Sequence, residues 1–375
     1  MLKTMRIAAA IAVASGLAVL AEAQAQPKAS LTIGLTLEPP HLDPTAGAAA
    51  AIDEIVYANL FEGLTRIDDN GAVQPQLAES WDVSGDGLVY TFTLQDGVKF
   101  HDGTNFDADD VVFSLDRARA DGSVNAQKQL FAAIDTVEAV DARTARITLS
   151  RPEGALLFNL GWGDAVMVAR ESAATNKVAP IGTGPFKFDR WVRGSQIRLV
   201  ATDDTRAIRK VTFRFVPDPS AQIAALKAGD IDAVSNLQAP EAVIALQADP
   251  NFEVAIGSTE GETILAMNNS RAPLNDIRVR QAIAHAIDRQ AIIDGAMFGF
   301  GTPIGTHFAP HHPAYVDLIA TYPHDPARAR ALLADAGQSD LKLTLKLPPP
   351  TYARRGGEIV AAQLKEAGIT VEIIP

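Results

Sequence analysis

The chain has 375 residues, a formal net charge of −12 at pH 7 and no cysteine. A negative charge of this size argues against nucleic acids and anionic membranes as partners. The missing cysteines exclude disulfides, thiolate metal sites, cysteine nucleophiles and the acylated cysteine of a lipoprotein anchor. Stability must therefore come from hydrophobic packing, and a chain of this length is expected to form two or more domains.

The chain begins with a pattern typical of a secretory signal peptide. Lys3 and Arg6 precede an apolar run over residues 7–20, and cleavage is expected after Ala23 or Ala25. The run is too short to cross a bilayer of about 30 Å, so residues 1–25 are predicted to be a cleaved leader. No second apolar run of spanning length follows. The sequence therefore predicts a periplasmic protein with no lipid anchor and no membrane insertion after cleavage.

The first elements after the leader are a strand, a break and a helix. Residues 30–37 alternate between apolar and polar side chains, which is the pattern of a half-buried strand. The segment EPPHLDP, residues 38–44, interrupts this pattern, and residues 50–61 have a helical one.

The segment DVSGDG, residues 82–87, resembles the start of a calcium-binding EF-hand loop. It has oxygen-bearing side chains at positions one, three and five and glycine at position six. Such a loop needs a glutamate at position twelve, where this chain has Thr93. Residues 88–95 alternate as a strand instead, and Asp96-Gly97 predicts a hairpin to a return strand over residues 98–101. The segment is therefore predicted to form a turn without calcium.

The rest of the chain alternates between hairpins, strands and capped helices, which predicts an α/β fold with large antiparallel insertions. Asp107, Asn275 and Asp325 are the expected helix N-caps, and Gly337 is an expected helix end. The predicted hairpins are 134–149 and 186–200, the predicted strands are 231–234, 341–347 and 369–374, and further helices are predicted over 108–118, 220–228 and 354–367.

Several short motifs, in this order along the chain, resemble the extracytoplasmic solute-binding proteins of family 5. These proteins are the dipeptide- and oligopeptide-binding components of ABC importers. The motifs are FEGL at 61–64, PQLAESW at 75–81, ADDVVFS at 108–114, GTGPF at 182–186, LKAGDID at 226–232, VRQAI at 279–283 and AIDR at 286–289. The set also includes Glu38 with LDP at 42–44 before these motifs, and ALL at 331–333, AG at 336–337, QL at 363–364 and AGI at 367–369 after them. Each motif alone has low specificity, but the ordered set extends over nearly the whole mature chain.

The resemblance implies an α/β, two-lobed periplasmic-binding-protein fold with an extra α/β domain inserted in the N-terminal half. It places residues 27–60 and 183–268 in lobe I, residues 61–182 in the inserted small domain and residues 269–375 in lobe II. Relatives continue beyond this point, so the chain is expected to be truncated at its C-terminus and lobe II to be incomplete. An exposed, apolar last strand supports the same expectation.

The function implied by the resemblance is delivery of peptides or similar small solutes to an ABC transporter permease, by a monomer that closes on its ligand. No catalysis and no cofactor are expected. Nickel complexes, opines and oligosaccharides are alternative ligands among relatives. The acidic residue with which peptide-binding relatives hold the ligand's amino terminus would lie beyond Pro375, so the resemblance does not carry peptide specificity to this chain.

Five residues are candidate ligand contacts. Glu38 follows the first strand, where ligands of α/β sheets collect, and matches an acidic cleft position of peptide-binding relatives; the alternative is a solvated loop carboxylate. Pro39 and Pro40 would shape the same wall. Asn268 would offer an amide to the ligand or cap the crossover between lobes. Trp162 would be an aromatic platform in the cleft or part of the small domain's core.

A group of three histidines is a weaker candidate for a metal site, because some relatives bind nickel. His307 and His311 are four residues apart, and His312 follows directly. Pro310 and Pro313 prevent the regular helix that would bring the first two side chains together. The sequence therefore predicts an ordinary loop here and no metal.

Two other interpretations remain open at this point. A secreted hydrolase is disfavoured because the sequence contains no G-x-S-x-G motif, no H-E-x-x-H motif and no cysteine nucleophile. A truncated gene product without function would be recognised by exposed hydrophobic surface and non-cooperative melting.

Overall fold

The computed structural model describes residues 28–259, 261–312 and 314–374, so the predicted signal peptide lies outside the described residues. Contacts divide the chain into two compact units. The first unit comprises the residues up to Leu31, Pro39–Val192 and Ile197–Thr212, and the second comprises Thr32–Glu38, Arg193–Gln196 and Phe213–Pro375. Within the described residues, no helix is both long enough and apolar enough to cross a membrane.

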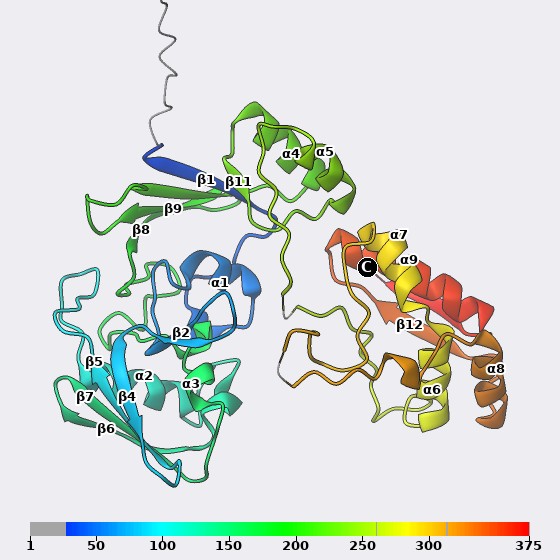
Figure 1. The fold of residues 1–375 in the computed structure, drawn as a ribbon, viewed down its shortest axis with the longest axis horizontal. Coiled ribbons are helices and arrows are strands. Elements are labelled where there is room, and N and C mark those ends of the chain that lie inside the picture. Colours follow the sequence, from blue (N-terminus) through cyan, green and yellow to red (C-terminus); the bar gives the residue numbers. More distant parts are fainter. Residues whose placement is uncertain (1–27, 260, 313, 375) are drawn as a thin grey trace, which may run out of the picture. The chain divides into compact units, whose positions relative to one another are not determined.

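A five-stranded sheet has the strand order β11-β1-β10-β9-β8 (Figure 1). Its strands are β1 (Ser30–Leu35), β8 (Phe186–Val192), β9 (Gln196–Ala201), β10 (Lys210–Phe215) and β11 (Ala233–Val234). β8 and β9 are neighbours, as predicted for the hairpin over 186–200. β1 and β11 run parallel, so their C-terminal ends lie at the same edge of the sheet.

The first unit contains a four-stranded antiparallel sheet of order β4-β5-β7-β6, against which helix α2 packs (Figure 1). Alternate residues of β5, namely Tyr90, Phe92 and Leu94, are buried and join Val111 and Leu115 of α2 in one hydrophobic core. The elements of this unit are η1 (Pro44–Ala46), α1 (Ala50–Val56), β2 (Thr65–Ile67), β3 (Val73–Pro75), β4 (Ala78–Val83), β5 (Val89–Leu94), α2 (Ala108–Arg119), η2 (Lys128–Phe131), β6 (Ile134–Asp141), β7 (Thr144–Leu149), α3 (Leu156–Asn159) and η3 (Gly163–Ala165).

The EF-hand-like segment is the turn between β4 and β5. Asp86 accepts hydrogen bonds from the Ser84 hydroxyl at 2.6 Å and from the Leu88 N–H at 3.1 Å, which confirms the predicted turn. The predicted hairpin over residues 88–101 is wrong, because β5 pairs with β4 and β7 instead. Phe100 packs edge-on against Phe106 at 6.0 Å between ring centres, which holds the expected return strand in a loop.

The second unit contains a two-stranded parallel sheet, β12-β13, and two helix pairs, α6 with α8 and α7 with α9. Its core includes Ile283, Leu333, Leu364 and Ile369, all at most 3% exposed. The elements besides those of the five-stranded sheet are α4 (Pro219–Ala228), η4 (Pro240–Ala242), α5 (Val243–Gln247), α6 (Ile277–Ala286), α7 (Arg289–Met297), η5 (Ile319–Thr321), α8 (Pro326–Asp335), β12 (Lys342–Lys346), α9 (Thr351–Glu366) and β13 (Thr370–Ile374).

Most predicted helix ends follow local sequence signals. Asp107 caps α2 in a capping box with Asp110, and Asp325 caps α8, as predicted. The predicted cap at Asn275 is wrong by one residue: Asp276 accepts the Arg278 N–H at 2.8 Å, and α6 begins at Ile277. A carboxylate at this position suits the positive end of the helix dipole better than a neutral amide does.

Candidate functional site

The second unit contains a cavity of about 250 Å³, which we call the α9 pocket. Four segments line it. They are residues 236–240 after β11, residues 261–263, the last two residues of α7, and the first turn and a half of α9, with Thr351, Tyr352 and Arg355. A cavity of this size fits a small solute.

The fold explains why polar groups gather at this pocket. The loop over residues 236–240 leaves the carboxyl end of a parallel strand, β11, which is the usual place for ligands of α/β sheets. Helix α9 has 16 residues and points its N-terminal end, the positive end of its dipole, at the same cavity. The lining is therefore suited to polar and anionic groups of a ligand.

Arg355, which lines the pocket, forms an ion pair with Glu241. Arg355 donates from Nη1 to Oε2 of Glu241 at 3.0 Å and from Nη2 to Oε1 at 2.8 Å, so the two groups form a bidentate pair. These hydrogen bonds lower the pKa of Glu241 and raise that of Arg355. The guanidinium carbon of Arg355 lies 5.6 Å from the centre of the Phe298 ring, a cation–π distance.

One acidic side chain, Glu262, lines the pocket itself and is largely buried. Its Oε2 lies 3.1 Å from Nδ1 of His307, one of the three histidines considered for a metal site. His312 stacks on Phe308 at 4.6 Å between ring centres. Among the residues that the structure describes, no group of three or more His, Asp or Glu side chains is arranged to hold a metal ion.

Glu38 is held at the five-stranded sheet. Both of its carboxylate oxygens lie 3.0 Å from the backbone N–H of Gly194, in the turn between β8 and β9. Pro39, which follows it, is buried, whereas Pro40 is exposed. Neither proline nor Glu38 lines the α9 pocket. The structure thus assigns Glu38 a role in fixing a turn, and its contact with a ligand stays a prediction.

The two other candidate contacts also have structural partners. Trp162 is 41% exposed and packs edge-on against Phe158 at 6.3 Å, so it is neither a full core residue nor enclosed in a pocket. Asn268 accepts hydrogen bonds from the N–H of Ser270 at 3.1 Å and from its hydroxyl at 2.7 Å, and so caps a turn. Ligand contacts by either residue stay predictions.

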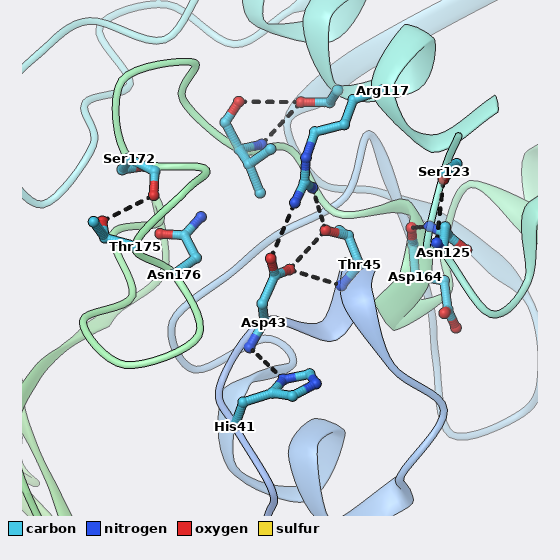
Figure 2. Close-up of polar contacts among 12 residues, drawn as sticks. His41, Asp43, Thr45, Arg117, Ser123, Asn125, Asp164, Ser172, Thr175 and Asn176 are labelled. Atoms are coloured by element: carbon cyan, nitrogen blue, oxygen red, sulfur yellow. Dashed lines mark hydrogen bonds and ion pairs between the residues drawn. The ribbon is translucent and has the colours of Figure 1, made fainter. Parts of the chain in front are cut away.

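The first unit has a buried polar cluster around Asp43, shown in Figure 2. Asp43 is 1% exposed; it accepts hydrogen bonds from the N–H and hydroxyl of Thr45 at 3.0 and 2.6 Å, and pairs with Arg117 at 3.1 Å. Every oxygen of this carboxylate is thus used within the protein. The cluster therefore ties the segment after β1 to α2 and has no carboxylate oxygen left over for a ligand.

Two other carboxylates of the first unit lack such partners. Asp53 in α1 and Asp164 in η3 each have an Oδ1 atom that is buried and without a hydrogen-bond partner among the described residues. Burial raises the pKa of both groups to about 6, and the charge of Asp53 adds to the effect on Asp164. A Cβ on Gly163 would lie 2.4 Å from Oδ1 of Asp53, so a larger residue here would force the Asp53 carboxylate to move.

None of the residues that line the α9 pocket was among the candidate ligand contacts predicted from the sequence. Helix α9 was expected to begin at 354, but it begins at Thr351, directly after three prolines, so Tyr352 and Arg355 both lie in its N-terminal part. The run PPPTYARR contained the signal, because prolines followed by polar residues are typical of a helix start. Glu241 and Glu262 had no comparable local signal.

Comparison with known proteins defines the class of this protein. The family model of the bacterial extracellular solute-binding proteins, family 5, matches residues 72–375. The mixed α/β fold also matches solved periplasmic binding proteins over 92% of the chain. The chain therefore belongs to the family 5 solute-binding proteins.

Individual relatives are identical to the chain at about a third of the aligned positions. The glutathione-binding protein GsiB of Salmonella paratyphi A is 31% identical over 310 residues, which is 80% of this chain and 60% of the relative. Di/tripeptide-binding protein 2 of Pseudomonas aeruginosa is 31% identical over 389 aligned positions, or 93% of this chain and 72% of the relative. The chain thus spans about 60% of the length of the glutathione-binding relatives.

Solved structures with bound ligands share the fold. The binding protein AgaA of A. tumefaciens R10 in complex with agropinic acid has a TM-score of 0.82 and 30% identity, covering 92% of this chain and 72% of AgaA. DppA of Helicobacter pylori in complex with the peptide STSA has a TM-score of 0.82 and 28% identity. The match covers 92% of this chain and 73% of DppA. NikZ of Campylobacter jejuni in complex with Ni(L-His) has a TM-score of 0.79 and 26% identity. The match covers 93% of this chain and 74% of NikZ.

Proposed function

We propose that the protein is the substrate-binding component of an ABC importer and that it captures peptides or similar small solutes in the periplasm. The observation that carries the proposal is the α9 pocket, a cavity of about 250 Å³ lined by both apolar and polar side chains, in a chain of family 5. Its charged and amide side chains would orient a polar solute. Binding, with neither catalysis nor a cofactor, is sufficient for this role.

The proposal includes the domain division implied by the sequence. Residues 27–60 and 183–268 would form lobe I, residues 61–182 the inserted small domain and residues 269–375 the beginning of lobe II. The segments lining the α9 pocket fall on both sides of residue 268, which supports a solute bound by parts of both lobes. A ligand with contacts in both lobes favours their closed arrangement, which the permease would recognise.

Further contacts are proposed for the residues singled out in the sequence. Glu38, Pro39, Pro40, Trp162 and Asn268 would complete the solute site. The leader over residues 1–25 would deliver the protein to the periplasm, where it would act as a monomer. These proposals are supported by the family, whose relatives bind glutathione, dipeptides and tripeptides according to their names.

Native mass spectrometry of protein purified without refolding tests the proposal. The protein is exchanged into volatile buffer and mixed with four probes, namely glutathione, an alanine tripeptide, agropinic acid and Ni(L-His). We expect a one-to-one adduct with at least one of the two peptides, and titration calorimetry then gives its affinity. An adduct with agropinic acid or the nickel complex alone would exclude peptides as the solute class. Binding of none of the four, or hydrolysis of a peptide, would refute the transport role.

A further inference from the structure

Both ring nitrogens of His101 are hydrogen-bonded to one short piece of backbone, which we call the 182–184 segment. Nε2 lies 3.0 Å from the carbonyl oxygen of Gly184, and Nδ1 lies 3.3 Å from the backbone nitrogen of Gly182. A carbonyl oxygen only accepts and a backbone N–H only donates, so Nε2 must carry the ring proton and Nδ1 must be the acceptor. The two contacts together therefore require a neutral imidazole in the Nε2–H tautomer.

The 182–184 segment leads into β8 and is closely packed. The backbone N–H of His101 donates to the Gly182 carbonyl at 2.9 Å, so the main chain and the ring hold the segment together. On the other side of the segment, the N–H of Gly184 donates to the Leu60 carbonyl at 3.0 Å. A Cβ on Gly182 would overlap that same carbonyl oxygen. His101 thus helps to fix a connection that has little room to adjust.

A protonated His101 does not fit this arrangement. An imidazolium has an N–H on both nitrogens, so its Nδ1–H would face the N–H of Gly182, donor against donor. Burial lowers the pKa of His101, and the charge of Lys187 on β8 lowers it further. The Gly184 carbonyl and the charge of Asp102 act in the opposite direction. The surroundings of the ring therefore favour its neutral form.

Glu62 is a second titratable group at the segment. Its Oε2 accepts a hydrogen bond from the Thr183 hydroxyl at 2.9 Å. Burial raises the pKa of Glu62, and the charge of Arg206 partly opposes this effect. Protonation of Glu62 therefore favours the folded state, whereas protonation of His101 favours the unfolded state. Acid thus acts on the segment with opposite signs through the two groups.

On this basis we propose that His101 is a pH switch: its neutral imidazole holds the 182–184 segment in place, and its protonation releases the segment. Release would loosen the connection through which the chain enters β8 and the five-stranded sheet. All the groups involved belong to the first unit. The inference does not depend on which solute the protein binds.

Two measurements test the switch. NMR of protein labelled with ¹⁵N-histidine reports the tautomer of each ring, and a titration reports its protonation together with the backbone amides of Gly182 and Gly184. Urea unfolding followed by tryptophan fluorescence, at pH 8 and pH 5, then compares the wild-type protein with His101→Asn. The asparagine oxygen can accept from the Gly182 N–H, but the side chain cannot be protonated. His324→Asn, an exposed histidine of the second unit, is the matched control.

We expect the ring of His101 to be the Nε2–H tautomer at pH 8 and to gain its second proton below the ordinary histidine pKa of 6.5. The amides of Gly182 and Gly184 should shift in the same step. Because the unfolded chain takes up this proton more readily, the neutral ring stabilises the protein above pH 6.5, and this stability is lost as the pH falls. The unfolding constant of the wild-type protein relative to His101→Asn should rise about tenfold from pH 8 to pH 5, the size of one hydrogen bond.

Other titrating groups do not obscure this comparison. Glu62 and the remaining carboxylates are present in both proteins, so their contributions cancel in the ratio, and His324→Asn should follow the wild-type protein. An Nδ1–H tautomer of His101 at pH 8, or its protonation without a shift of the Gly182 amide, would overturn the proposal. A ratio that does not change with pH would do the same. If His101→Asn did not fold, the titration of the wild-type protein would decide alone.

Discussion

Replacing Asp164 by asparagine should stabilise the first unit of the protein at neutral and alkaline pH. Asp164 is 8% exposed, and its Oδ1 has no hydrogen-bond partner among the described residues. Burial and the nearby charge of Asp53 raise its pKa from 3.8 to about 6. An asparagine has nearly the same shape and carries no charge, and its N–H groups would offer donors to the orphaned oxygen of Asp53.

The size and sign of the effect follow from the pKa shift. A shift of about 2 units corresponds to about 3 kcal/mol, which partial solvent contact reduces to about 2 kcal/mol. In the unfolded chain the carboxyl group ionises above pH 3.8, but in the folded protein it stays protonated up to about pH 6. Protonation of Asp164 therefore favours the folded state, and ionisation favours the unfolded state. The free energy of unfolding that protonation contributes is lost as the pH rises through 6.

Urea unfolding followed by tryptophan fluorescence measures the effect directly. All three tryptophans, Trp81, Trp162 and Trp191, lie in the first unit, so the signal reports on that unit. At pH 8 we expect Asp164→Asn to be about 2 kcal/mol more stable than the wild-type protein, and at pH 4 the difference should nearly vanish. The exposed Asp69→Asn is the matched control. A variant equally or less stable than the wild-type protein at pH 8, or a gain that does not depend on pH, would refute the reasoning.

Two further substitutions test packing and ion pairing. Gly182→Ala should destabilise the protein by about 3 kcal/mol in thermal melts, because its Cβ would lie 2.0 Å from the Leu60 carbonyl oxygen. Gly85→Ala has no atom within 4 Å of the new Cβ and should be nearly neutral; equal melting of both variants would contradict the steric argument. Asp43→Ala should cost about 3 kcal/mol in urea unfolding, because it breaks a buried pair with Arg117. Asp116→Ala removes only an exposed pair with Arg119 and should cost less than about 1 kcal/mol, so equal losses would contradict the burial argument.

The ion pair at Asp43 and the ion pair at Arg355 differ in how far their carboxylates are exposed to water. Around Asp43 every carboxylate oxygen has a partner within the protein, so that cluster has a structural role. At the α9 pocket, Arg355 pairs with Glu241, whose side chain is 39% exposed.

The family and much of the local structure were predictable from the residues alone. Helix caps at Asp107 and Asp325 and the turn after β4 were predictable, because each depends on side chains within a few residues of the backbone they bind. The ordered motifs between residues 61 and 289 were sufficient to indicate the family that the comparison later confirmed.

Strand pairing and contacts between distant side chains depend on tertiary packing and were not predictable from local patterns. Strand β5 has a turn signal at each end, and sequence alone could not tell that it pairs with β4 rather than with residues 98–101. The α9 pocket was not predictable, because Glu262 and Arg355, which line it, and Glu241, which pairs with Arg355, come from segments that no local pattern connects. Local signals specify elements, whereas a binding site depends on contacts between residues more than a hundred positions apart.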